Sequence, residues 1–237
     1  MTGLADLLLA RTCGGCGVTG TRWCPSCASS LIGPVLATNR GPLQVWSAAN
    51  YDGALREALN AWKDHGRADL DGVLAMALAG VLDQVDPDQV DLDQPGPDQP
   101  GPDQAHPDHP DTDRPGQPAA LVPVPSSASA RRARGRHPVR DLALAVRPRR
   151  RVLPGLRHAR PLADQAGLDA AARASNLHGA LRVRAGWLAR LRSAGPVLLI
   201  DDVVTSGATL LEAHRALETA GVQVRGAVCV AATVRRI

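Results

Sequence analysis

The chain has 237 residues, and this length allows one sizeable α/β domain with a small appendage, or two compact domains. Aromatic residues make up only 2% and phenylalanine is absent, so we expect a core of Leu, Val, Ala and Ile. The net charge is +4, no run approaches the ~20 apolar residues of a membrane helix, and residues 1–10 have no basic start, which predicts a cytoplasmic protein without a membrane span.

Residues 1–40 are expected to form a small metal-binding module. Two Cys-x-x-Cys hooks lie seven residues apart, and four thiolates in a tetrahedron are the ligands that structural Zn²⁺ prefers. Disulfides are the rival interpretation, although a chain without a secretory signal belongs in a reducing compartment. A closed four-sulfur site has no open position for a reacting water, so the metal would stabilise the module rather than catalyse. The four candidate ligands are Cys13, Cys16, Cys24 and Cys27.

Residues 41–237 are expected to form the main domain. Val45–Tyr51 has the composition of a strand, and two stripes of apolar residues at helical spacing follow it. The first stripe is Leu55, Leu59 and Trp62; the second is Leu70, Leu74, Leu78, Val81 and Leu82, with the helical pattern ending near Val85.

Residues 86–118 interrupt this domain with Pro-Asp-Gln repeats and almost no apolar side chains. We predict a disordered insert, because such a segment cannot bury enough surface to offset its ordering entropy. Ten of the 23 acidic residues lie between Asp83 and Asp113, which leaves +14 on the rest of the chain. That charge would attract phosphate-bearing ligands, including nucleotides and nucleic acids.

The middle of the chain combines short strands with arginine-rich segments. Residues 126–140 read as a basic loop, which is either a hood over an anionic substrate or a solvated surface. A second cluster, residues 147–151, is more typical of a solvated surface than of a nucleic-acid contact. Strands are predicted at Ala120–Val124 and Ala180–Val183, and helices at Val139–Val146, Leu168–Asn176 and Trp187–Leu191.

The last third has the clearest pattern, a parallel strand–helix–strand unit. Val197–Ile200 is a buried-strand run, Ala208–Ala220 is helical with Gly221 as its stop, and Val222–Val230 is again strand-like. Ligands of parallel sheets bind beyond the carboxyl ends of the strands. We therefore place the functional site at the loop predicted for residues 201–209.

This segment contains the groups needed to hold a ribose 5-phosphate. Backbone N–H groups and hydroxyls at Thr205, Ser206 and Thr209 can bind a phosphate at the helix N-terminus, and Gly207 allows close approach. The adjacent carboxylates of Asp201 and Asp202 suit a ribose diol, or a Mg²⁺ that arrives with a pyrophosphate.

The pattern from Val197 to Thr209 closely resembles the phosphoribosyl pyrophosphate (PRPP) motif of type I phosphoribosyltransferases. With the four cysteines, further motifs come in the order seen in ComF-type proteins, and the resemblance spans nearly the whole chain apart from the insert. These motifs are Tyr51-Asp-Gly-Ala-Leu-Arg56, Lys63-x-x-Gly66, Val122-Pro-Val-Pro125, Arg134-Gly135, Gln165-x-Gly-Leu168 and Asn176-Leu-His-Gly-Ala180. The chain departs from its relatives after Arg134-Gly135 and after Lys63, where aromatic residues are usual.

The resemblance implies an α/β fold with a parallel sheet, flanking helices and a zinc-ribbon-like head. It also implies a Mg²⁺-dependent site with Asp201 and Asp202 as catalytic residues and Lys63 and Arg134 on the pyrophosphate. PRPP or another ribose 5-phosphate ligand would contact Asp201, Asp202, Val203, Val204, Thr205, Ser206, Gly207, Ala208 and Thr209.

Two hypotheses for function remain open at this stage. The first is a phosphoribosyltransferase with an unknown acceptor, linked through the resemblance to DNA uptake in natural competence. The second is a non-catalytic adaptor that binds single-stranded DNA beside competence and recombination proteins. A plain regulatory sensor of phosphate is the third and simplest alternative.

Overall fold

A computed structural model describes residues 11–31, 33–86, 118–127, 132, 134–146, 150–160 and 176–233. The chain is an α/β protein whose main sheet has the strand order β1-β2-β7-β6-β3. β1 and β2 are antiparallel, and the pairs β2–β7, β7–β6 and β6–β3 are parallel. The strands are β1 (Leu36–Arg40), β2 (Leu43–Asn50), β3 (Ala120–Pro123), β6 (Val197–Val204) and β7 (Val224–Ala232).

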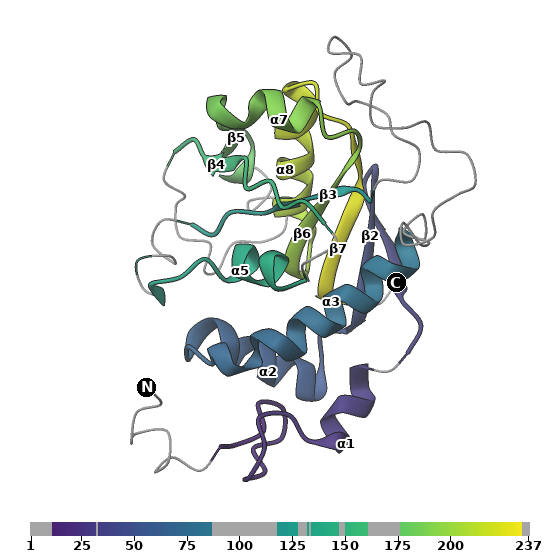
Figure 1. Ribbon diagram of the computed structural model, residues 1–237, viewed down its shortest axis with the longest axis vertical. Coiled ribbons are helices and arrows are strands. Elements are labelled where there is room, and N and C mark those ends of the chain that lie inside the picture. Colours follow the sequence, from purple (N-terminus) through teal and green to yellow (C-terminus); the bar gives the residue numbers. More distant parts are fainter. Residues whose placement is uncertain are drawn as a thin grey trace, which may run out of the picture.

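Helices cover both faces of this sheet (Figure 1). On one face, α2 (Gly53–Asp64), α3 (Asp71–Val85) and α5 (Pro138–Ala145) form one apolar cluster with the sheet. On the other face, α8 (Ala208–Thr219) packs beside α7 (Leu188–Arg192) and a two-stranded ribbon. The ribbon is β4 (Leu156–His158) paired with β5 (Leu181–Val183). Short 3₁₀ turns lie at Ser29–Leu31, Ala68–Leu70 and Ala185–Trp187.

The core is mainly aliphatic, as the composition predicts, but it also contains one large aromatic side chain, Trp62. Trp62 is 1% exposed on the inner face of α2, and its indole Nε1 donates a 2.5 Å hydrogen bond to Asp71 Oδ1 at the start of α3. This bond ties the two helices together where they meet. α3 ends at Val85, at the position predicted from its apolar stripe.

β1 lies within the range 1–40 that the cysteine pattern assigned to the N-terminal module. Its residues pair with β2 from Leu36↔Ser47 to Arg40↔Leu43, and this pairing makes β1 the edge strand of the main sheet. The cysteines precede it, together with the short helix α1 (Pro25–Ala28). In Figure 1 this N-terminal part lies beneath α2, away from the sheet.

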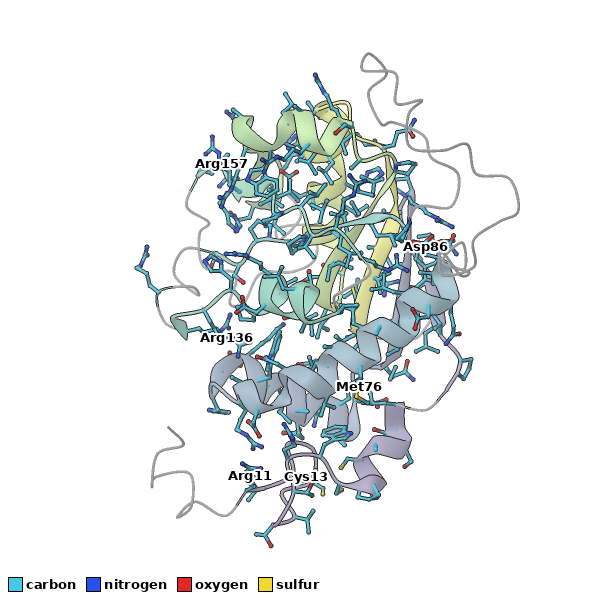
Figure 2. The ribbon with its side chains drawn as sticks, viewed as in Figure 1. Arg11, Cys13, Met76, Asp86, Arg136 and Arg157 are labelled. Carbon is cyan, nitrogen blue, oxygen red and sulfur yellow. The ribbon has the colours of Figure 1, made fainter. Side chains whose placement is uncertain are left out.

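Asp86 is buried, although it is the first residue of the range predicted to be a disordered insert; residues 87–117 lie outside the described residues. Its side chain is 1% exposed and forms ion pairs with Arg150 at 2.5 Å and Arg225 at 2.8 Å. It also accepts the backbone N–H of Ala119 at 3.0 Å. Burial raises the pKa of Asp86, but these donors outweigh it and hold the pKa below its usual value. Asp86 therefore joins the end of α3 to the start of β3 (Figure 2).

No helix in the described ranges is long and apolar enough to cross a membrane. The helix predicted at Leu168–Asn176 lies outside the described residues except for its last position. The unit β6–α8–β7 is parallel, as expected, and places the carboxyl end of β6 next to that of β7.

Candidate functional site

The two adjacent acids lie inside a strand, and the prediction that they begin a loop is wrong. β6 continues through Asp201 and Asp202 to Val204, because its backbone pairs with β7 as far as Val204↔Ala232. The connecting loop is therefore only residues 205–207 before α8 begins at Ala208. Strand pairing fixes the backbone of both acids, so their side chains leave opposite sides of a rigid element.

Lys63 joins Asp202 in one cluster, although the two are far apart in sequence. Lys63 Nζ lies 2.9 Å from Asp202 Oδ1, and the same oxygen accepts the N–H of Val203 at 2.7 Å. Burial lowers the pKa of Lys63, but the negative charges of Asp202 and then Asp201 outweigh it and leave the pKa raised. Lys63 is thus a fully charged ammonium at neutral pH, held at the carboxyl end of the sheet by the last turn of α2.

Asp201 has the opposite tendency. Burial and then the adjacent charge of Asp202 raise its pKa well above the usual value for aspartic acid. Lys63 and the N–H of Asp202, which donates to Asp201 Oδ1 at 2.9 Å, work against this rise. A carboxyl that holds its proton more tightly reduces the repulsion between the two acids. The two acids and the Lys63 ammonium thus interact at the carboxyl end of β6, where their oxygens could accept hydroxyl groups or bind a cation.

The segment after β6 has the geometry of an anion-binding turn. Gly207 has φ 84°, a left-handed conformation that favours glycine, and it is the N-cap of α8. The first N–H groups of a helix have no intrahelical acceptor, so those at the start of α8 face the turn. Ser206 Oγ accepts the N–H of Ala208 at 3.4 Å, and Thr205 is exposed.

Arg40, at the end of β1, packs against this turn and bonds to it. No sequence pattern indicated this residue. Its guanidinium donates to the carbonyl of Thr205 at 3.3 Å and to that of Thr233 at 3.2 Å. The stem of Arg40 lies directly under Gly207, where an added Cβ would come within 2.7 Å of Arg40 Cγ. Arg40 is 5% exposed, so a buried positive charge lies at the floor of the turn.

Arg134 lies near Lys63 but has a carboxylate partner of its own. Arg134 Nη2 is 3.0 Å from Asp64 Oδ1, and Asp64 is the residue after Lys63 at the end of α2. The structure therefore brings the two basic residues assigned to pyrophosphate to the same end of one helix. Among the described residues, the Arg134 guanidinium contacts neither Asp201 nor Asp202.

Arg136 follows directly after the Arg134-Gly135 pair. It stacks over the Trp62 ring at 5.5 Å and donates to Asp71 at 2.6 Å. Its Nε lies 3.5 Å from Asp141 Oδ2 (Figure 2). The basic loop predicted for residues 126–140 is thus fastened to α2 and α3 near its end, and α5 begins within it at Pro138.

The four N-terminal cysteines form a cluster that could hold a metal ion. Their sulfur atoms all lie within 4.8 Å of one another, and Cys16 Sγ is 3.6 Å from Cys24 Sγ. Tetrahedral zinc–thiolate bonds of about 2.3 Å would separate the sulfurs by about 3.8 Å, so the arrangement fits such an ion. All four thiols are free, and their separations are too long for the rival disulfides.

Backbone donors prepare one of these thiols to ionise. Burial raises the pKa of Cys13, but N–H groups of Cys16, Cys24 and Gly15 outweigh it and lower the pKa to about 6. At Cys27, burial raises the pKa of the thiol, and hydrogen bonds with the neighbouring thiols raise it further. A bound dication would remove this difference, since it favours the thiolate at every ligand.

Two glycines let the cysteine cluster pack directly on the main domain. An added Cβ at Gly15 would lie 2.8 Å from Ala54 in the first turn of α2 and 2.8 Å from Cys27 Sγ. One at Gly14 would lie 2.7 Å from Leu70 Cδ1. Arg67 adds a 2.7 Å hydrogen bond to the carbonyl of Thr12. The cluster therefore braces the opposite end of the helix that carries Lys63.

In comparisons with known proteins, no family model matches the chain, and the search of curated proteins finds no match. What the chain does is therefore inferred from its own residues and their geometry.

Proposed function

We propose that the chain is a PRPP-binding, phosphoribosyltransferase-like protein of the ComF type. The observation that carries this proposal is the carboxyl end of β6, where Asp202 is followed five residues later by Gly207, the N-cap of α8. The acids would hold the ribose hydroxyls, and residues 205–209 would hold the 5-phosphate. Lys63 and Arg134, at the end of α2, are suited to the pyrophosphate.

The chemistry that suits this arrangement is transfer of the ribose phosphate to an acceptor. Pyrophosphate leaves an oxocarbenium-like ribose, and the protein contributes mainly by positioning and by stabilising charge. Mg²⁺ would arrive with the pyrophosphate and meet the carboxylates of Asp201 and Asp202. Arg134 would exchange its single contact with Asp64 for the pyrophosphate, whose oxygens match the forked donors of a guanidinium.

Binding of parts of the substrate tests this division of the site. Ribose 5-phosphate should raise the temperature of unfolding without Mg²⁺, because the turn and the acids bind it alone. PRPP should require Mg²⁺ for its full effect, and Lys63→Met should weaken PRPP more than ribose 5-phosphate, which feels Lys63 only through its ion pair with Asp202. Equal loss of both ligands in Lys63→Met would contradict the assignment of Lys63 to pyrophosphate.

Structural zinc in the cysteine cluster is the second part of the proposal. We expect purified protein to contain stoichiometric zinc, and Cys24→Ser to lose it and unfold at a lower temperature, since metal binding and folding are coupled in such modules. Metal analysis and thermal unfolding measure both. Cys229→Ser is the matched control, because this buried cysteine lies on β7 outside the cluster and should leave the zinc content unchanged.

A DNA-binding adaptor is the second candidate, and one feature favours it. Arg157 and Arg182 are directly opposite each other on the β4–β5 ribbon, and both are exposed (Figure 2). Like charges in this position destabilise a strand pair, and a phosphate backbone would relieve the repulsion.

The salt dependence of single-stranded DNA binding tests this candidate. Changing both residues to Gln should reduce the slope of log affinity against log salt by about 1 to 2, whereas Arg56→Gln on α2 should not change it. An unchanged slope in the double variant would remove the ribbon from any DNA-binding surface.

A further inference from the structure

A hollow of ≈ 270 Å³ opens at the carboxyl end of β3, between α5 and the β4–β5 ribbon. We call it the edge hollow. Its walls come from four separate parts of the chain: the end of β3 with the residues that follow it, the start of α5, the segment that leads into β4, and the segment that leads from β5 into α7. Six of its lining residues carry the argument: Pro123, Ser126, His137, Arg140, Arg184 and Trp187.

The charge of the edge hollow is positive. Arg140 comes from α5 and Arg184 from the segment after β5, and none of the described residues that line the hollow is acidic. In the described ranges of the chain, neither guanidinium forms an ion pair, whereas Arg134, Arg136, Arg150, Arg215 and Arg225 all do. Arg190 stacks over the Trp187 ring at 5.4 Å and adds a third guanidinium near this wall. An anion in the hollow would therefore find charge-assisted donors, and no carboxylate among the described lining residues would compete with it.

Most of the remaining lining is apolar and includes a flat surface. The Trp187 ring is partly buried, and Pro123, Pro154 and Leu156 complete the wall around it. Aromatic and proline faces pack well against planar rings, and small-molecule sites usually combine such a surface with a few convergent polar groups. Ser126 and His137 supply further hydrogen-bonding groups at the rim.

Backbone hydrogen bonds hold the walls in place without a ligand. The N–H of Val124 donates to Ile200 on β6 at 2.9 Å, and His158 Nε2 lies 3.0 Å from the carbonyl of Pro125. On the opposite wall, the N–H of Arg184 donates to Gly155 at 2.7 Å. A site that is already formed loses less entropy when it binds.

From this combination we propose that the edge hollow binds a small planar anion, namely a single aromatic or heterocyclic ring that carries a carboxylate. Arg140 and Arg184 hold the carboxylate, and the ring lies against Trp187 and the prolines. This site is distinct from the Asp201–Asp202 cluster, and its occupancy does not depend on PRPP.

Three related probes separate charge from shape. Benzoate has both the ring and the carboxylate, benzamide has the ring without the charge, and cyclohexanecarboxylate has the charge without the plane. Calorimetric titration of each into the full chain should show benzoate binding at least about tenfold more tightly than either analogue. Benzoate that fails to bind at millimolar concentration, or that binds no better than both analogues, would overturn the proposal.

Variants assign the binding to this hollow. Changing Arg140 and Arg184 together to Gln should weaken benzoate by roughly tenfold or more, and Trp187→Leu should abolish the preference for benzoate over cyclohexanecarboxylate. Arg56→Gln removes an arginine elsewhere and should leave binding unchanged. Both substituted arginines are exposed, so thermal unfolding should confirm that the double variant is folded.

The Asp201→Asn, Asp202→Asn variant separates this proposal from the phosphoribosyltransferase one, since it should bind benzoate as the parent does. Benzoate binding that survives loss of both Arg140 and Arg184 would place the ligand elsewhere and refute the assignment.

Discussion

Replacing Asp86 with alanine is expected to lower the free energy of unfolding by about 3–5 kcal/mol. The change removes the carboxylate that Arg150 bonds in a setting where both side chains are almost fully buried. It also removes the acceptor of the Ala119 N–H, which holds the start of β3. Denaturant unfolding of the full chain measures this loss.

Arg225→Gln is the matched control for the Asp86 variant. Arg225 pairs with the same carboxylate, but its side chain is 39% exposed, so its loss should cost about 1 kcal/mol or less. Because the folded pKa of Asp86 lies below its unfolded value of about 3.8, its stabilising effect is complete above that value. It is lost as the pH falls through the lower, folded pKa. If both variants lowered the free energy of unfolding by the same small amount, Asp86 would not be what joins α3 to β3.

Gly207→Ala is expected to be the most damaging single change in the turn of residues 205–207. The left-handed backbone alone costs an alanine about 1–2 kcal/mol. The added Cβ would also collide with Arg40, where the nearest atoms are Cγ at 2.7 Å and Cβ at 2.9 Å, close to the backbone of β1 and therefore unable to move freely. We expect a drop in stability of roughly 2–4 kcal/mol and a loss of at least about tenfold in affinity for ribose 5-phosphate.

Gly221→Ala isolates the contribution of the backbone. Gly221 follows the other end of α8, has φ 73°, and an added Cβ there would meet Arg192 only at ordinary contact distances of 3.5 Å and more. It should lose stability by the backbone term alone and leave ribose 5-phosphate binding intact. If both variants bind the ligand equally well, the turn at Gly207 is not the phosphate site.

Local patterns predicted the helices and strands of this chain well. The apolar residues of α2 and α3 recur every three or four positions, as in a helix. The aliphatic runs of β3 and β6 are short and continuous, as in a buried strand. The strands β1 and β4 were not predicted, and the extent of β6 was predicted too short. Aspartic acid is depleted in strands, so two adjacent acids indicated a loop, and only pairing with β7 keeps them in the strand.

Contacts between distant residues could not be predicted in the same way. Lys63 was found through the family resemblance, but Arg40 follows an ordinary Ala-Thr-Asn run and bonds a carbonyl 165 residues away. Asp86 stands at the edge of a segment whose composition indicates disorder, and its second arginine lies 139 residues further along the chain. No sequence pattern indicated the edge hollow either, because its walls come from four separate segments.

The most direct test of the central claim is a calorimetric titration of PRPP with Mg²⁺ into the zinc-loaded protein, beside the Asp201→Asn, Asp202→Asn variant. Asparagine keeps the size of each side chain and removes its charge, and the variant should remain folded because both positions lie in a paired strand. We expect PRPP to bind the parent and to lose at least about a hundredfold in affinity in the variant. A folded parent that does not bind PRPP, or a variant that binds it equally well, would contradict the assignment of this site.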